Sequence, residues 1–260
     1  MLVSLFSAEG IVFAADRQIV SRSDSGATVR HRHGHRPKVM RVHGLGVGRS
    51  GVIGYWGLAQ VSGRPMSEWL AEQASGWHGS RTVEEFARHL QDVLAGCTTK
   101  REREIESGFH IAGFEEREGH TVPVCWVVRN RSDHDARTGL YRRTLPSWDD
   151  VGEHVPRGNL SHVSAKGLRT HLRTHQQANG MPYWLRNGDI RDFSKPYNAL
   201  ATAVHELVAA PRFSTPTTLD GWERLAKTLV ATAAALYRIY YSTGDVPVEG
   251  SATTVSVPWP

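Results

Sequence analysis

Residues 1–17 read MLVSLFSAEGIVFAADR, and the pattern in this stretch decides the fold. Two short apolar runs, at residues 2–6 and 11–15, are separated by the glycine-containing segment at residues 7–10. Apolar runs of this length, interrupted by a turn signal, predict a hairpin of two β-strands. The same reasoning predicts further short strands at residues 39–42, 44–48 and 52–55. A sheet made of such strands needs helices on at least one face.

Helical patterns follow these strands along the chain. Apolar side chains recur at helical spacing over residues 66–77 and, more regularly, over 83–94. Thr82 with Glu85 three residues later has the pattern of a capping box, which predicts the start of the second helix. Further helices are predicted at residues 163–179, 198–208 and 219–241, further strands at 109–114, 122–128 and 253–257, and polar loops at 18–37 and 129–162.

The order of these elements points to a fold class. Several strands come one after another, and so do several helices. This grouping predicts an α+β protein, because an α/β protein would alternate single strands with single helices. Two antiparallel sheets with helices on both outer faces would bury all of the apolar stripes. We therefore expect a single domain over residues 1–260, with an irregular and helical insertion at about 129–197.

The composition is that of an ordinary globular chain. Of 260 residues, 40% are hydrophobic and 22% are charged, which excludes collagen-like, coiled-coil and wholly disordered classes. No apolar run approaches the roughly 20 residues that a membrane-spanning helix needs, and residues 1–10 lack the basic leader of a signal peptide. Two cysteines cannot build a disulfide framework. We therefore expect a cytoplasmic protein without a membrane segment.

Positive charge is concentrated at the beginning of the chain. Residues 1–50 carry eight Lys and Arg against three acids, which equals the net charge of +5 for the whole chain. Such a patch can bind nucleic acid, or it can be a solvated basic loop. No aromatic side chain lies between residues 29 and 37, which favours the loop, so a nucleic-acid partner is not expected.

Four segments resemble a known family. They are residues 10–17 (GIVFAADR), 37–39 (PKV), 54–59 (GYWGLA) and 109–116 (FHIAGFEE). In this order and spacing they resemble the β-type subunits of the proteasome, over roughly the first half of the chain. Residues 129–196 are not a close match. The resemblance implies an N-terminal nucleophile (Ntn) hydrolase with a four-layer αββα sandwich.

The resemblance also implies a catalytic site. Members of this family attack a peptide carbonyl with the side-chain oxygen or sulfur of their first residue, whose own α-amine accepts the proton. Residue by residue, Asp16 corresponds to the family's strand carboxylate and Lys38 to its buried cation. Gly57 corresponds to the glycine whose N–H faces the developing oxyanion. No cofactor is implied.

The nucleophile does not carry over from the family. Aligning Gly10 and Asp16 places the family's first threonine just before Met1, and removing Met1 would leave Leu2, which has no nucleophile. Ser4 could serve only after the loss of three residues, which would shorten the strand that holds it.

Three functions are therefore open at this point. The first is peptide-bond hydrolysis by a proteasome β-like subunit of a homo-oligomeric ring. The second is a non-catalytic, ring-forming scaffold subunit, and the third is a binding module that uses the basic loop. Asp16 and Lys38 have an alternative role as an ordinary ion pair between strands, and Gly57 as a turn glycine with positive φ.

Two further groups of residues have side chains that can bind a metal or react. His31, His33 and His35 alternate along the chain and could converge on a metal from one face of a strand. The intervening arginines repel a divalent cation, so a solvated loop is favoured and no metal is expected. Cys125 lies within an apolar run and is predicted to be a small core residue.

Overall fold

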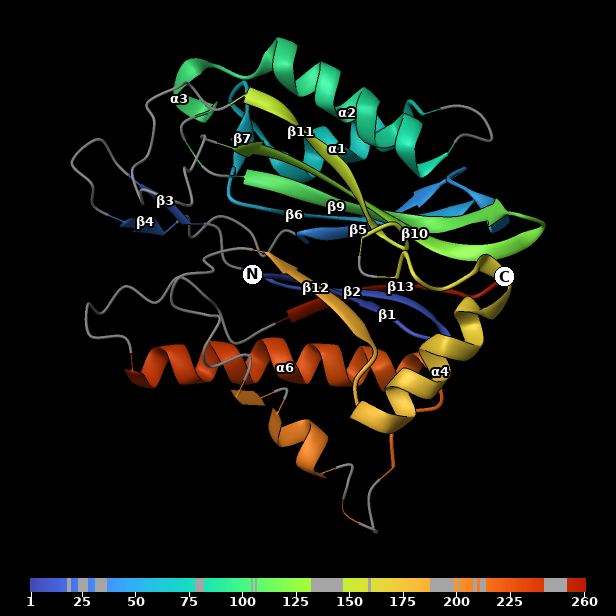
Figure 1. Ribbon diagram of the computed structural model, residues 1–260. Helices are drawn as coiled ribbons and strands as arrows, with labels where there is room; N and C mark the ends of the chain where they lie inside the picture. The colour runs from blue at the N-terminus through green and yellow to red at the C-terminus, as the bar shows by residue number, and fades with distance from the viewer. Residues whose placement is uncertain are drawn as a thin grey trace, which may run out of the picture.

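The computed structural model describes most of the chain. The described residues are 1–17, 20–22, 28–30, 37–77, 82–103, 105, 107–131, 147–158, 160–187, 199–200, 202–207, 210, 214–240 and 252–260. Two antiparallel sheets form its centre (Figure 1). The α+β class with antiparallel sheets, predicted from the order of the elements, is therefore confirmed.

The first sheet is built around the predicted N-terminal hairpin. Strand β1 (Leu2–Phe6) pairs with β2 (Gly10–Asp16), so that Leu2 lies opposite Ala15. Gly10 closes the turn with φ of 152°, and a Cβ atom there would lie 2.4 Å from the carbonyl oxygen of Val257. The edges of the sheet are β12 (Tyr183–Asn187), which pairs with β1, and β13 (Ala252–Pro258), which pairs with β2.

The second sheet has five strands in the order β11-β10-β9-β6-β5. Their bounds are β5 Val39–His43, β6 Ser50–Trp56, β9 Ser107–Arg117, β10 His120–Arg131 and β11 Ser147–Val155. Strands β9 and β10 form a long hairpin, as predicted, although both extend beyond the apolar runs that indicated them.

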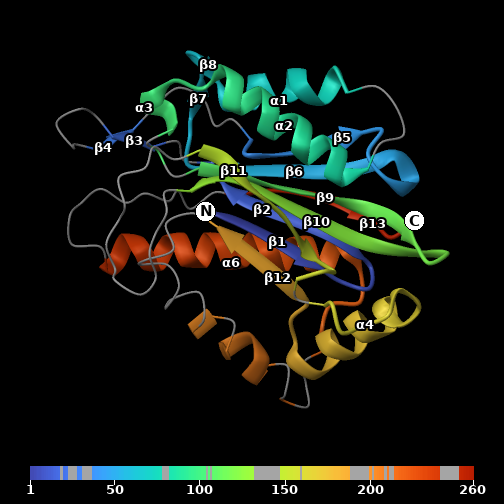
Figure 2. The ribbon, with the colours of Figure 1, turned by 45° about the horizontal axis from the view of Figure 1, so that its top comes forward.

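Helices lie on both outer faces of the two sheets (Figures 1 and 2). Helices α1 (Met66–Ser75) and α2 (Val83–Cys97) cover the five-stranded sheet, and α6 (Leu219–Tyr240) covers the four-stranded sheet. Strand β1 shows how alternation places the core, because Leu2 and Phe6 face the second sheet whereas Val3 and Leu5 face α6. Alternate apolar side chains of one hairpin therefore pack into two separate layers of the core.

The predicted helices are present among the described residues, although the one predicted from residue 163 begins as an α-helix at Leu168. At the start of α2, Thr82 and Glu85 form both hydrogen bonds of a capping box. Leu168 and Leu172 are buried on one face of α4 (Leu168–Asn179). The charged run after α2 contains the short helix α3 (Lys100–Arg103). Residues 199–200 and 202–207 are also helical.

Three segments differ from the sequence-based predictions. Residues 129–162 were predicted as a loop, but strand β11 lies there, and β12 also falls within the segment expected to be irregular or helical. The supposed loop at residues 18–37 contains a two-stranded ribbon of β3 (Val20–Arg22) and β4 (Thr28–Arg30). Residues 44–48 were predicted as a strand, but positive φ at Gly44, Gly46 and Gly48 makes them a turn that ends in a short 3-10 helix.

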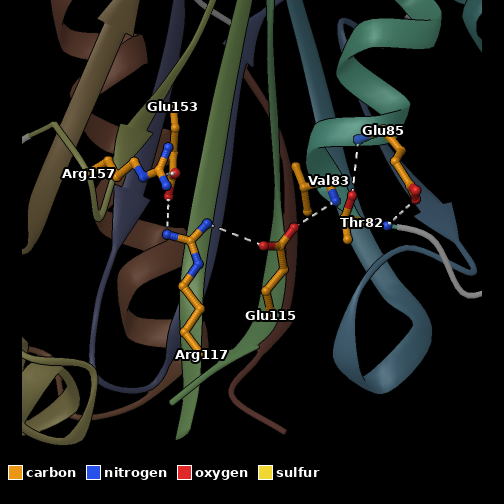
Figure 3. Close-up of polar contacts among 7 residues, drawn as sticks. All are labelled: Thr82, Val83, Glu85, Glu115, Arg117, Glu153 and Arg157. Carbon is orange, nitrogen blue, oxygen red and sulfur yellow. Dashed lines mark hydrogen bonds and ion pairs between the residues drawn. The ribbon is translucent and has the colours of Figure 1, made fainter. Parts of the chain in front are cut away.

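An ion-pair network fastens α2 to the second sheet (Figure 3). The carboxylate of Glu115 in β9 accepts a hydrogen bond from the N–H of Val83 at 2.8 Å. Arg117 contacts Glu115 at 3.3 Å and Glu153 of β11 at 2.7 Å, and Arg157 lies 3.6 Å from Glu153. A carboxylate from the sheet thus satisfies one of the unpaired N–H groups at the start of α2.

Replacing Glu115 by alanine should lower the free energy of unfolding by about 1 kcal/mol, because the N–H of Val83 would lose its acceptor. The matched variant Glu115→Gln keeps an oxygen acceptor and loses only the charge, so it should cost less. Urea denaturation of the two variants tests this, and equal losses would show that the effect comes from the charge of Glu115 and not from the hydrogen bond to Val83.

Candidate active site

The structure brings Asp16 and Lys38 together, as expected from the sequence. Asp16 ends β2 in the first sheet, whereas Lys38 lies just before β5 in the second. The Nζ atom of Lys38 donates to both carboxylate oxygens of Asp16, at 3.1 and 3.2 Å. Asp16 is fully buried and Lys38 nearly so. One ion pair therefore joins the two sheets where the chain begins.

The N-terminal amine belongs to the same cluster. The α-ammonium group of Met1 contacts Oδ1 of Asp16, which is also bonded to Lys38, and the N–H of Asp16 donates to the carbonyl oxygen of Met1 at 3.3 Å. Two cations thus share one buried carboxylate. The side chain beside the amine is a thioether that packs against the core under α6.

The charge of Asp16 depends on these partners. Burial acts to raise the pKa of the Asp16 carboxyl, but the neighbouring Lys38 and α-ammonium outweigh it, so that the pKa is lowered. Asp16 is therefore an anion at neutral pH. An anion at this position holds both Lys38 and the amine in place.

Gly57 lies beyond the end of β6, on the Lys38 side of the second sheet. Two residues earlier, the N–H of Tyr55 donates to the carbonyl oxygen of Lys38 at 3.0 Å. Gly57 itself is exposed and has φ of 81°, a conformation that favours glycine. Both of its predicted roles, turn glycine and N–H donor to an oxyanion, are compatible with this conformation.

Ser4 lies away from the charged cluster. It is buried in β1, opposite Phe13 of β2 and Leu185 of β12. Its Oγ atom lies 2.7 Å from Nδ1 of His110 in β9, so this hydrogen bond joins the two sheets. In the folded chain the hydroxyl of Ser4 is enclosed in the core, away from any substrate.

His110 is a buried residue that sequence reasoning missed. The edges of the Phe13 and Trp56 rings pack against it, at centroid distances of 6.1 and 5.3 Å. Burial, with smaller effects of His154 and Arg129, lowers the pKa of His110 to about 3. It is therefore a neutral hydrogen-bonding partner of Ser4. Its only sequence signal was a lone imidazole within the apolar run 109–114.

The remaining candidate residues are three histidines and Cys125. His31, His33 and His35 lie outside the described residues. Cys125 is buried in β10, as predicted, and burial raises the pKa of its thiol. Among the residues that the structure describes, no group of three or more His, Cys, Asp or Glu side chains could hold a metal ion.

Within the described ranges, no helix has both the length and the apolar character needed to cross a membrane. Comparisons of this chain with models of known protein families and with curated protein sequences gave no match.

Proposed function

We propose that this chain is a proteasome β-like subunit of the Ntn hydrolase class, and that it hydrolyses peptide amide bonds beside the Asp16–Lys38 pair, at the amine of the first residue of the mature chain. The observation that carries the proposal is the Asp16–Lys38 ion pair, which is buried between two antiparallel sheets and contacts the α-amine of Met1, just before β1. The resemblance of residues 10–17 and 37–39 to the family points to the same two side chains.

Each group has a defined role in this chemistry. An uncharged α-amine accepts the proton of an adjacent hydroxyl or thiol, which then attacks the peptide carbonyl carbon. Lys38 stabilises the negative charge on the nucleophile, and Asp16 holds Lys38 in position. The N–H of Gly57 donates to the oxyanion that forms. The amine returns its proton to the leaving amine, and water releases the acyl group.

This reaction requires a hydroxyl or thiol beside the reacting amine. Met1 offers a thioether, and the hydroxyl of Ser4 is bonded to His110. These two observations favour a second candidate function, that of a non-catalytic subunit of a ring. In that function, the Asp16–Lys38 pair serves only to join the sheets.

Turnover of a fluorogenic peptide, measured with the mature N-terminus and the mass of the native assembly, separates the two functions. A hydrolase should show an N-terminal Thr, Ser or Cys, and Lys38→Ala should reduce turnover at least 100-fold. The matched control is Arg41→Ala, because Arg41 also links β5 to the first sheet, through the carbonyl oxygen of Ser256 at 2.6 Å, without contacting Asp16.

Two results would contradict the hydrolase. One is equal turnover in the Lys38→Ala and Arg41→Ala variants. The other is an intact Met1 without turnover, which would support the non-catalytic subunit if the native mass is that of a ring.

A further inference from the structure

The peptide that follows Gly57 is held by buried hydrogen bonds from a distant part of the chain. The N–H of Leu58 donates to Oγ of Ser107, the first residue of β9, at 2.8 Å. The Ser107 hydroxyl donates in turn to the carbonyl oxygen of Ile105 at 2.8 Å. Leu58 and Ser107 are both buried, so water does not compete for these bonds.

Asn130, near the end of β10, completes this arrangement. Its side-chain oxygen accepts a hydrogen bond from the N–H of Ser107 at 2.6 Å. Its side-chain amide donates to the carbonyl oxygens of Arg103 and Ile105, at 3.0 and 2.8 Å. Asn130 is 1% exposed. One amide therefore holds Ser107, Arg103 and Ile105 together.

The chain is also fixed on the other side of Gly57. Trp56 ends β6 and pairs with Gly108 of β9. A Cβ atom on Gly108 would lie 2.4 Å from the Trp56 ring, so this contact is close packed. Gly57, at φ of 81°, thus lies between a strand residue and an anchored N–H. With both neighbours held, its own N–H has little freedom to reorient.

We infer that Ser107 and Asn130 are positioning residues, which hold the Gly57–Leu58 peptide and thereby fix the backbone of Gly57 in the conformation that presents the Gly57 N–H to the reacting carbonyl oxygen. This inference rests on the proposed hydrolase function. Neither side chain is inferred to touch the substrate. The N–H donor must already point at the position of the oxyanion before the reaction begins, because reorienting it during the reaction would lower the rate.

The segment after Gly57 forms a short ribbon of β7 (Gln60–Val61) and β8 (Arg64–Pro65), and an anchor in the turn of this ribbon serves as a matched control. The N–H of Ser62 donates to the carboxylate of Glu102 in α3 at 2.7 Å, and the Ser62 hydroxyl donates to the carbonyl oxygen of Cys97 at 2.7 Å. Glu102 thus fixes the turn five residues beyond Gly57, at an exposed position. Removing this anchor should loosen the turn while leaving the Gly57 peptide in place.

The experiment compares Ser107→Ala with Glu102→Ala by two measurements. Hydrogen exchange of the Leu58 amide should become at least tenfold faster in Ser107→Ala and stay unchanged in Glu102→Ala. For peptide hydrolysis, Ser107→Ala should lower kcat about tenfold or more with KM within twofold, whereas Glu102→Ala should change neither. If the alanine variant does not fold, Ser107→Cys keeps a similar size with a weaker acceptor and should show the same trend.

Two failures can be told apart. If the wild-type protein hydrolyses peptide and the kcat of Ser107→Ala matches that of Glu102→Ala, the positioning role is overturned while the hydrolase remains. If exchange at Leu58 responds as expected but the wild-type protein shows no turnover, the proposed function is overturned, and the positioning role falls with it.

Discussion

Replacing Asp16 by asparagine should lower the free energy of unfolding at pH 7 by about 3–5 kcal/mol. Asparagine keeps the shape of the side chain but removes the negative charge that Lys38 and the α-ammonium of Met1 share. Two like charges in a buried location would then lose the carboxylate that they share. Chemical denaturation followed by circular dichroism measures the loss.

A double variant separates the charge interaction from a simple loss of packing. In Asp16→Asn/Lys38→Met both members of the pair are neutral, so the double variant should be more stable than Asp16→Asn alone. The control is Glu84→Gln, which breaks the exposed Glu84–Arg88 pair on α2 and should cost well under about 1 kcal/mol. A loss in Asp16→Asn no larger than in Glu84→Gln would show that the buried pair contributes nothing.

The pH dependence of this pair has a definite sign. Because the pKa of Asp16 is lowered in the folded chain, its contribution is fully present above the pKa of an unfolded aspartate, near 4. The contribution is lost as the pH falls further and the folded carboxyl takes up a proton. At pH 7, the Asp16→Asn variant therefore reports the whole effect.

The parts of the fold that could be predicted are those with a strong local pattern. The runs at residues 2–6 and 11–15 are short, apolar and separated by a turn, and they form β1 and β2. The pairing of Asp16 with Lys38 could be anticipated because the resemblance to a family named both residues. The capping box at Thr82 and Glu85 is a local interaction, and it is present as predicted.

Strands β11 and β12 could not be predicted because their pattern is set by the fold around them. Strand β11 has buried residues near its two ends, Trp148 and Val155, with a polar stretch between them. Trp148 is held by Phe109 and by a hydrogen bond to Thr98 at 3.1 Å, both distant in sequence. Both strands lie at sheet edges, where alternation is weakly required.

The buried polar residues were missed for a related reason. Ser107 and Asn130 stand at or near strand ends, where polar residues are ordinary, and only the folded chain brings them to Leu58. Ser4 was considered solely as a nucleophile, and nothing local indicates that its partner is His110, 106 residues away. Hydrogen bonds between sheets have no sequence period to reveal them.

Acidification should destabilise the protein strongly through His110, and this effect should be reduced in His110→Asn. In the folded chain the pKa of His110 is lowered to about 3, whereas an unfolded histidine titrates near 6.5. Between these values the unfolded state binds one more proton, so each pH unit of acidification costs about 1.4 kcal/mol. From pH 6.5 to 4.5 the contribution amounts to about 2 kcal/mol, because the unfolded histidine is only half protonated at pH 6.5.

The His110→Asn variant tests this contribution through the slope of the unfolding free energy against pH. This slope is independent of the value of the unfolding free energy at pH 7. Asparagine can still form a hydrogen bond with the Ser4 hydroxyl, but it is smaller and leaves space beside Phe13 and Trp56, so His110→Asn should be less stable at neutral pH. Its stability should nevertheless fall less steeply on acidification, because asparagine takes up no proton when the chain unfolds. His120→Asn, at the exposed turn between β9 and β10, controls for the loss of one imidazole. Parallel curves of unfolding free energy against pH for the wild-type protein and His110→Asn would mean that His110 titrates alike in both states, and that the core between the sheets does not keep its imidazole neutral.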